Sequence, residues 1–320
     1  MAPDKLIPSP GKEAPSFLSR FANLNWTVVV AGVALVGVYL YYFGFVRIFY
    51  NGDQSTWTWA WNAWNPENNY EHAKLIPLIV GFLVWHAREK LMVAPVHSSN
   101  WGWLFIGVGI FLYLAGARTL QGRVTMLGVP FLLYGSVLYI WGRSVARILL
   151  FPIAFLLFAV PLNFLSQATV NLQFLETGAA SAICNFIGIH VNTLGTTMTA
   201  ADNTFRFEVN EGCSGIRSLM AIAMLSAIYG HMTQDRLWKK IAIFAAAVVF
   251  AIIGNAGRLV SIVLVARFFG QDLAGGPYHM ISGYLSFPFA LGAMILFARL
   301  LNIGRKPPTR PAVTNEPVSI

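Results

Sequence analysis

Long apolar runs constrain this chain more than any other feature. A helix that crosses a bilayer needs about 20 mostly apolar residues, because its backbone polar groups must be bonded within the segment. Of the 320 residues, 56% are hydrophobic and 11% are charged, whereas about a quarter of a soluble domain is charged. The sequence therefore predicts an all-α, polytopic transmembrane bundle of about eight spans. The runs are 26–46, 74–91, 102–117, 125–141, 145–161, 214–231, 239–267 and 280–301.

Polar ends flank these runs. Residues 1–25 contain prolines and charged residues, and the run that follows is too long for the apolar core of a signal peptide. We interpret it as an uncleaved first span after a cytoplasmic tail. Residues 305–320, rich in Pro and polar residues, are typical of a disordered cytoplasmic tail. Between them, residues 26–304 are expected to form one transmembrane catalytic domain.

Lysines and arginines orient the chain. Most of them lie in the two tails and in the loops 86–101, 142–147 and 232–240, so the positive-inside rule places this side in the cytoplasm. Both termini are then cytoplasmic, and residue 213 lies outside. The net charge of +9 collects in small groups at the ends of apolar runs, which topology explains better than a nucleic-acid partner.

One segment does not fit easily into this count of eight spans. Residues 164–189 are long enough to cross but carry polar side chains, among them Gln167, Asn171, Gln173 and Glu176. We interpret the segment as an amphipathic or partly re-entrant helix on the outer face. A helix packed against the bundle is the competing interpretation. If the segment crosses the membrane, residue 213 changes sides.

A short hairpin is expected next. Residues 196–200 and 204–209 flank Asp202 and Asn203, and the second run alternates apolar and polar residues. A surface loop is the alternative. Either way, the segment leads directly into Glu211, Gly212 and Cys213.

Cys213 is the first candidate for chemistry. It lies at or just before the first turn of a helix, where free N–H groups favour a thiolate, and Arg217 shares that helix face. The alternative is that Cys213 is a small hydrophobe. The two cysteines, Cys184 and Cys213, are too few for a disulfide scaffold and lack metal-ligand spacing, although a bond between them stays possible.

Arg258 is the second candidate. An arginine inside an apolar span costs about 2.5 to 3.5 kcal/mol on insertion scales, so a functional role is the default interpretation. At about 1.5 Å per residue it lies roughly 28 Å above Lys239, near the outer surface and level with Cys213. Asn255 shares its helix face, where it could hold the guanidinium or contact substrate. The alternative is a snorkelling arginine.

His279 is the third, at the outer entrance of the last run. Alone it would be interpreted as a cap or surface residue, but it is expected at the depth of Cys213 and Arg258. The chemistry assigns a thiolate nucleophile to Cys213, an oxyanion stabiliser to Arg258 and a proton donor to His279. Glu211 and Asn255 are expected to support them, and His72 is a weaker candidate at another outer entrance. No metal or other cofactor is expected.

These residues resemble those of a known family. The string EGCSGIRS over residues 211–218, the Asn255-x-x-Arg258 motif and His279 are similar to the exosortase/archaeosortase family of membrane cysteine transpeptidases. Residues 70–77 and 151–162 resemble further family segments, so the similarity runs from about residue 57 to residue 300. The chain departs from the frequent Tyr-Ser-His-Gly pattern, because Glu71 and Ala73 flank His72.

The resemblance implies a protein-sorting enzyme. Such an enzyme recognises a C-terminal signal made of a short motif, a transmembrane helix and a basic cluster, of the PEP-CTERM type in bacteria. It cleaves the secreted protein at the signal and passes it to an acceptor, here unknown. Cys213, Arg258 and His279 match the family's catalytic positions, and the expected location is the bacterial inner membrane. An intramembrane protease that only hydrolyses, or a polytopic transporter, are the alternatives.

Overall fold

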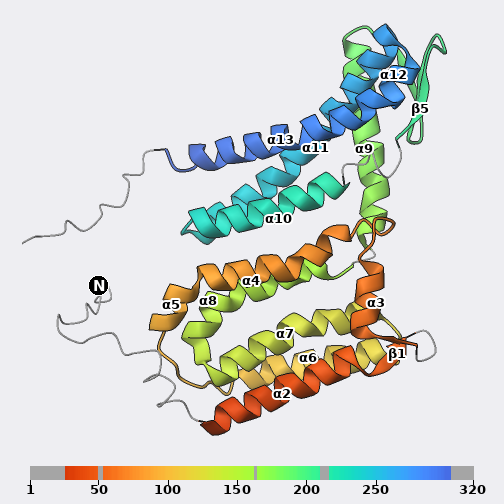
Figure 1. The fold of residues 1–320 in the computed structure, drawn as a ribbon. Coiled ribbons are helices and arrows are strands. Elements are labelled where there is room, and N and C mark those ends of the chain that lie inside the picture. Colours follow the sequence, from red (N-terminus) through yellow and green to blue (C-terminus); the bar gives the residue numbers. More distant parts are fainter. Residues whose placement is uncertain (1–25, 50–52, 162–163, 210–215, 304–320) are drawn as a thin grey trace, which may run out of the picture. The chain divides into compact units, whose positions relative to one another are not determined.

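The computed structural model describes residues 26–49, 53–161, 164–209 and 216–303, and the chain divides into two compact units at residues 162 and 163 (Figure 1). Each of the eight predicted runs coincides with helix. By length and composition, four helical segments of the described part can cross a membrane: 122–140, 142–159, 237–269 and 277–300. The mostly helical fold is as predicted, whereas eight spans, the single domain over 26–304 and both tails stay predictions.

The first unit is built from helices around two very short strands. Its elements are α2 (Trp26–Gly44), β1 (Arg47–Phe49), β2 (Gln54–Ser55), α3 (Thr56–Ala63), η1 (Glu71–Leu75), α4 (Ile76–His86), α5 (Arg88–Val93), α6 (Gly102–Arg118), α7 (Gly122–Ile140), α8 (Gly142–Phe155) and η2 (Leu156–Ala159). The predicted run 74–91 is divided among η1, α4 and α5. Arg88 begins α5, stacks 4.2 Å from the Trp85 ring and donates to the Trp85 carbonyl.

Glycines let α6 and α7 approach closely. A Cβ on Gly109 would lie 2.5 Å from Leu132 Cγ, and one on Gly135 would lie 2.7 Å from the Ile106 nitrogen. Neither position has room for a side chain. Between membrane helices, where lipid is as apolar as the partner helix, such close backbone packing supplies much of the attraction.

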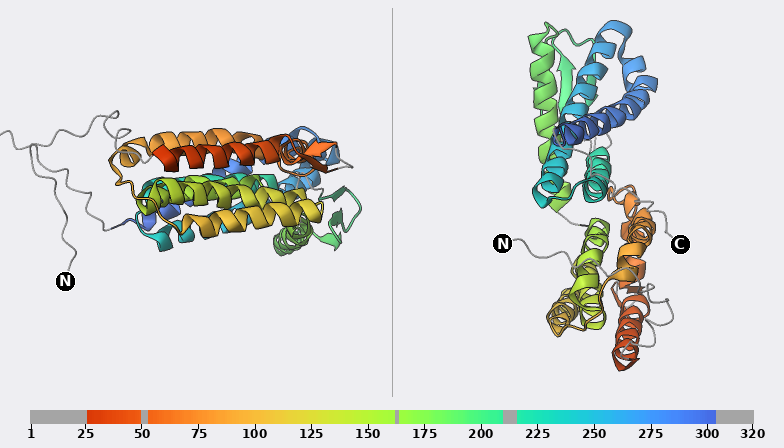
Figure 2. Two further views of the ribbon diagram at one scale, coloured as in Figure 1. Left: turned by 90° about the horizontal axis from the view of Figure 1, so that it is seen from below. Right: turned by 90° about the vertical axis from the view of Figure 1, so that its left-hand side faces the viewer.

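The second unit places a helix and a small sheet beside a helical bundle. Its elements are α9 (Phe164–Phe186), β3 (Val191–Leu194), β4 (Thr197–Ala200), β5 (Arg206–Glu208), α10 (Ile216–Thr233), α11 (Leu237–Phe269), α12 (Gln271–Gly275) and α13 (Pro277–Leu300). Helix α9 runs crosswise to α10 and α13 in both views (Figures 1 and 2). It is not among the four candidate spans.

The sheet contains the predicted turn and one strand more. Strands β4 and β5 pair antiparallel, and Asn203 adopts a φ of 59° in the turn between them. Asp202 accepts from the Thr204 hydroxyl at 2.7 Å and pairs with Arg267 at 2.6 Å. The bonds from Thr204, aided by Arg267, lower the pKa of Asp202. Strand β3, which the sequence analysis did not predict, pairs with the other edge of β4.

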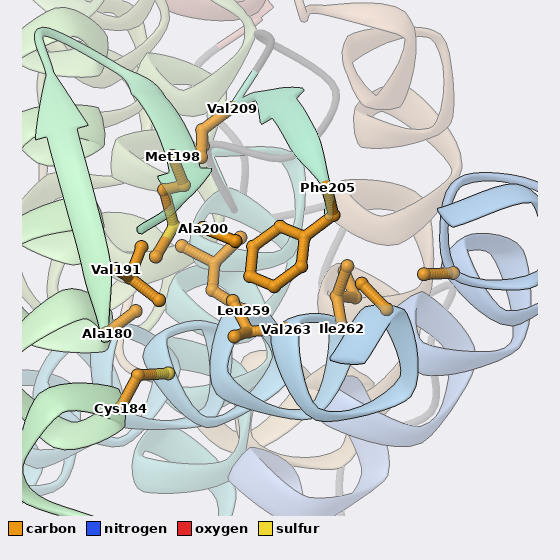
Figure 3. Packing of buried hydrophobic residues seen from close by; sticks show 12 residues of the cluster. Ala180, Cys184, Val191, Met198, Ala200, Phe205, Val209, Leu259, Ile262 and Val263 are labelled. Atoms are coloured by element: carbon orange, nitrogen blue, oxygen red, sulfur yellow. The ribbon is translucent and has the colours of Figure 1, made fainter. Parts of the chain in front are cut away.

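A hydrophobic core joins the sheet to α9 and α11 (Figure 3). Phe205 is buried between the sheet and the α11 residues Leu259 and Ile262. Cys184 of α9 is a free, fully buried thiol in the same core, where it packs as a small apolar side chain.

Helices α11 and α13 are tied at the end away from this core. Lys239, in the first turn of α11, is buried and donates through Nζ to the carbonyl of Leu301 and to Asn302 Oδ1. Farther along, Ala247, Ala251, Ala290 and Met294 pack these helices together. This packing sets the register in which residues near 258 face residues near 279.

Candidate active site

Arg258 and His279 lie side by side, although 21 positions separate them. Arg258 belongs to α11, and His279 to the first turn of α13. Arg258 Nη2 lies 3.4 Å from His279 Nε2 and donates to the His279 carbonyl oxygen at 3.2 Å. Both residues are half-buried. When Nη2 donates to Nε2, the imidazole is neutral with its lone pair on Nε2.

Ser282 and Gly283 form the surface on which the guanidinium rests. Arg258 Nε donates to Ser282 Oγ at 3.2 Å, and that hydroxyl donates to the His279 carbonyl at 2.9 Å. A Cβ on Gly283 would lie 3.4 Å from Nη2, so the guanidinium packs against a bare turn of α13. Within the described residues, Nη1 makes no hydrogen bond.

Glu176 of α9 lies behind this pair. Its side chain is buried, with 1% exposed, and its Oε2 accepts from Asn255 Nδ2 at 2.6 Å. Asn255 is itself buried and precedes Arg258 by nearly one turn of α11. The contact fastens α9 to α11 at the level of the site.

The electrostatics of Glu176 follow from its burial. Burial raises the pKa of this carboxyl to about 8, while the bond from Asn255 and the charge of Arg258 act in the opposite direction. A mainly protonated Glu176 at neutral pH still accepts the bond from Asn255. A protonated Glu176 therefore does not neutralise the positive charge of Arg258.

A pocket of about 730 Å³ opens beside the pair. It lies between β5 and α12, with Leu259 and Ile262 of α11 in its wall, and His279 also lines it. We call it the β5 groove. Among the described residues, no three His, Cys, Asp or Glu side chains gather as metal ligands would.

Comparison with family models matches residues 61–297 to the transmembrane exosortase family, Exosortase_EpsH. The chain belongs to this family. Comparison with curated proteins and with solved structures finds no match. The matched range includes Arg258, His279, Glu176 and the whole β5 groove, so the family's own segment contains the geometry described above.

Not every site residue predicted for this exosortase is placed by the structure. Cys213 and Glu211 lie outside the described residues. Arg217 is exposed in the first turn of α10. Asn255 is placed against Glu176. The roles of all of them stay predictions.

His72 belongs to the first unit of the exosortase chain. Its ring lies 5.3 Å from the Tyr70 ring, and its Nε2 is buried without a hydrogen bond among the described residues. Burial lowers the pKa of His72, and the Phe158 main chain and Glu71 act in the opposite direction. Its part in the site stays a prediction.

Sequence reasoning missed Glu176 and Ser282. Glu176 is one of several polar residues in 164–189, and its partner Asn255 lies 79 positions away. The one available signal was that a carboxylate in an apolar segment needs a partner. Ser282 follows His279 by three positions, the spacing at which side chains share a helix face.

Proposed function

We propose that this exosortase is a membrane cysteine transpeptidase that cleaves C-terminal sorting signals outside the cytoplasmic membrane. One observation carries the proposal: an arginine and a histidine from two different helices meet at 3.4 Å beside an open groove. The described chain resumes at α10 three residues after Cys213 and ends at Val209 four residues before it. Val209 lines the same groove as His279, which supports the proposal.

The chemistry begins at Cys213. Its thiolate adds to a peptide carbonyl carbon, and the carbonyl oxygen becomes an oxyanion that Arg258 stabilises through its remaining donors. The C–N bond then breaks, and His279, which has taken the proton of the Cys213 thiol, delivers that proton to the departing amine. The product is a thioester between Cys213 and the secreted protein. An incoming nucleophile adds to the thioester and expels the thiolate.

The substrates in this proposal are secreted proteins whose C-terminal signal combines a short motif, a transmembrane helix and a basic cluster, as in the PEP-CTERM type. Both termini of the enzyme are cytoplasmic, and α9 lies along the outer face of the bacterial inner membrane. The crosswise course of α9 relative to α10 and α13 supports this placement (Figure 2). Glu211, Asn255, Arg217 and His72 are proposed to support catalysis or to contact substrate.

Processing of a co-expressed reporter tests the proposal. The reporter is a secreted protein that ends in the C-terminal signal of a protein from the same genome. Cys213→Ala and His279→Ala are each expected to abolish cleavage while the enzyme still accumulates in the membrane. If the protein is a transporter, cleavage of the reporter does not depend on it, and cells with either variant should show normal cleavage. This result would overturn the proposal.

The mass of the new C-terminus separates transfer from hydrolysis. Mass spectrometry of the released reporter is expected to show an added acceptor, since transfer replaces one acyl bond by another. A free carboxylate as the sole product would show that the thioester is only hydrolysed and would reject the transpeptidase step.

A further inference from the structure

Strand β5 is the edge strand of its sheet and directly precedes the segment that holds Cys213. The Ala200 nitrogen donates to the Phe205 carbonyl, and the Val209 nitrogen donates to the Thr196 carbonyl. In an antiparallel pair, the residues between such bonded pairs direct their N–H and C=O groups away from the partner strand. Arg206 and Glu208 therefore present their backbone groups outward.

On the opposite edge of the sheet, Thr193 has no hydrogen-bond partner among the described residues, but the first outward position is covered. There, Val191 of β3 holds the outward position, its nitrogen donates to Asn185 Oδ1 at 2.9 Å, and its carbonyl accepts from Asn185 Nδ2 at 3.2 Å. Ser181 donates to the same carbonyl. Proteins commonly cover sheet edges in this way, because an open edge pairs with other chains.

On the β5 edge, the Arg206 nitrogen is the one outward group that has a partner among the described residues. The Arg206 nitrogen donates to Gln271 Oε1 at 3.1 Å. For the Glu208 N–H and for the outward carbonyls, the described residues supply no hydrogen bond. Glu208 lines the β5 groove between Phe207 and Val209, and Gln271, the partner of the Arg206 nitrogen, lines it as well. The side-chain oxygen of Gln271 occupies the position in which a carbonyl oxygen of an added strand would accept from the Arg206 N–H.

We propose that the substrate binds as an added β-strand along the outer edge of β5, in the β5 groove. This inference rests on the proposed function and specifies how its substrate is held. The outward groups of Arg206 and Glu208 recur every two residues, roughly 7 Å apart, which is the repeat of an extended peptide and not of a helix or a lipid.

The position and charge of the groove fit this occupant. His279 lines the groove and also contacts Arg258. A strand in the groove therefore lies beside these two residues. Glu208 and Asp272 also line it, and both residues are exposed. Their negative charges favour a peptide that directs neutral or basic side chains toward them over one that directs acidic ones there.

Site-specific crosslinking tests binding apart from catalysis. In full-length Cys213→Ala protein, a photoreactive p-benzoylphenylalanine replaces Gln271 in the groove or, as the control, Leu194 on β3, which is 84% exposed and does not line the groove. The probe is the reporter described above. We expect the crosslink to the reporter at position 271 to be at least tenfold stronger than at position 194. Equal crosslinking, or crosslinking at 194 alone, would overturn the proposal.

A proline substitution tests the backbone contact itself. Glu208→Pro removes an outward N–H and leaves the bonds of Phe207 and Val209 to β4. Thr193→Pro makes the same change at an outward position of β3. Loss of one hydrogen bond with its desolvation predicts about tenfold slower processing by Glu208→Pro. Thr193→Pro should stay within about twofold of the unsubstituted protein, and Glu208→Ala should lose less than Glu208→Pro.

The outcomes separate this inference from the proposed function. If Cys213 is needed for cleavage but the crosslinks at 271 and 194 are equal and Glu208→Pro equals Thr193→Pro, strand addition is wrong and the catalytic proposal stands. If Cys213→Ala cleaves normally, the catalytic proposal fails whatever binds in the groove. If Glu208→Pro does not accumulate, the crosslinking result decides.

Discussion

At the scale of single residues, the site depends on the shape of one guanidinium. Arg258 uses Nε toward Ser282 and Nη2 toward His279, two directions fixed by a planar group. A lysine at this position has the same charge but presents it as a point on a flexible stem. The geometry therefore requires arginine, rather than any cation.

Replacing Arg258 by lysine tests this requirement. Arg258→Lys is expected to slow reporter processing by about 100-fold, the loss seen when one oxyanion donor is removed. Arg267→Lys is the matched control, because Arg267 lies on the same helix and pairs with the exposed Asp202. We expect it to stay within about twofold of the unsubstituted protein. Equal rates for the two variants would contradict the role of Arg258.

Glu176 gives the site a dependence on pH. Because burial raises its pKa from 4.5 to about 8, the folded protein holds a proton that the unfolded chain releases near 4.5. The stability that this proton contributes is full below 4.5, falls as the pH rises from 4.5 to about 8, and is constant above.

Melting curves of detergent-purified protein check this sign. Glu176→Gln keeps an oxygen that accepts from Asn255 and cannot titrate. Its melting temperature should rise relative to that of the unsubstituted protein between pH 5 and pH 8, and the difference should then stay constant. Parallel curves for the two proteins across this range would show that Glu176 does not titrate as described.

The sequence drew attention to Arg258 and His279 but not to the side chains that contact them or their neighbours. Arg258 was recognisable because a charge inside an apolar run is costly, and His279 because it was expected at the depth of Arg258 and Cys213. Glu176 was not, because its bond to Asn255 depends on how α9 crosses α11, and no local pattern encodes a crossing. The position of Cys213 against the pair stays a prediction, because Cys213 lies outside the described residues.

At the scale of elements, apolar length predicted helices well and their ends less well. The run 74–91 became three helical pieces because charged Arg88 begins a separate helix, a break that hydropathy alone does not show. Strand β3 is four residues long, and its edge is completed by Asn185 and Ser181 of α9. Because side chains from outside the sheet stabilise this strand, its own residues show little of the sequence pattern that predicts a strand.

The contact between α6 and α7 makes a sharp prediction at this scale. A methyl group at residue 135 would meet the Ile106 nitrogen at 2.7 Å and the Gly102 oxygen at 2.9 Å, both backbone atoms that cannot turn aside. Gly135→Ala should therefore destabilise the protein by about 1 to 3 kcal/mol.

Gly107 supplies the control on the same helix pair. A Cβ there meets nothing within 4 Å, so Gly107→Ala should be neutral or slightly stabilising. Unfolding of both variants in mixed detergent micelles measures the difference. A Gly135→Ala protein as stable as Gly107→Ala would mean that the two helices separate easily to admit a side chain.

At the scale of the whole molecule, the proposed topology makes a prediction about access. Leu194 of β3 is 84% exposed and is placed outside the cell, while Leu237 at the start of α11 is 70% exposed and is placed in the cytoplasm. In a Cys213→Ala background, a membrane-impermeant maleimide added to intact cells should label Leu194→Cys. It should label Leu237→Cys only after the membrane is broken. The reverse pattern would place the site in the cytoplasm.

The contact between Arg258 and α13 also orders events during synthesis. The chain is made from its N-terminus, so α11 leaves the ribosome before Ser282 and the His279 carbonyl exist to accept from the guanidinium. An arginine without acceptors is costly in lipid, which favours insertion of α11 and α13 as a pair. The contact between Arg258 and His279 consequently forms only after α13, the last described helix, has been translated.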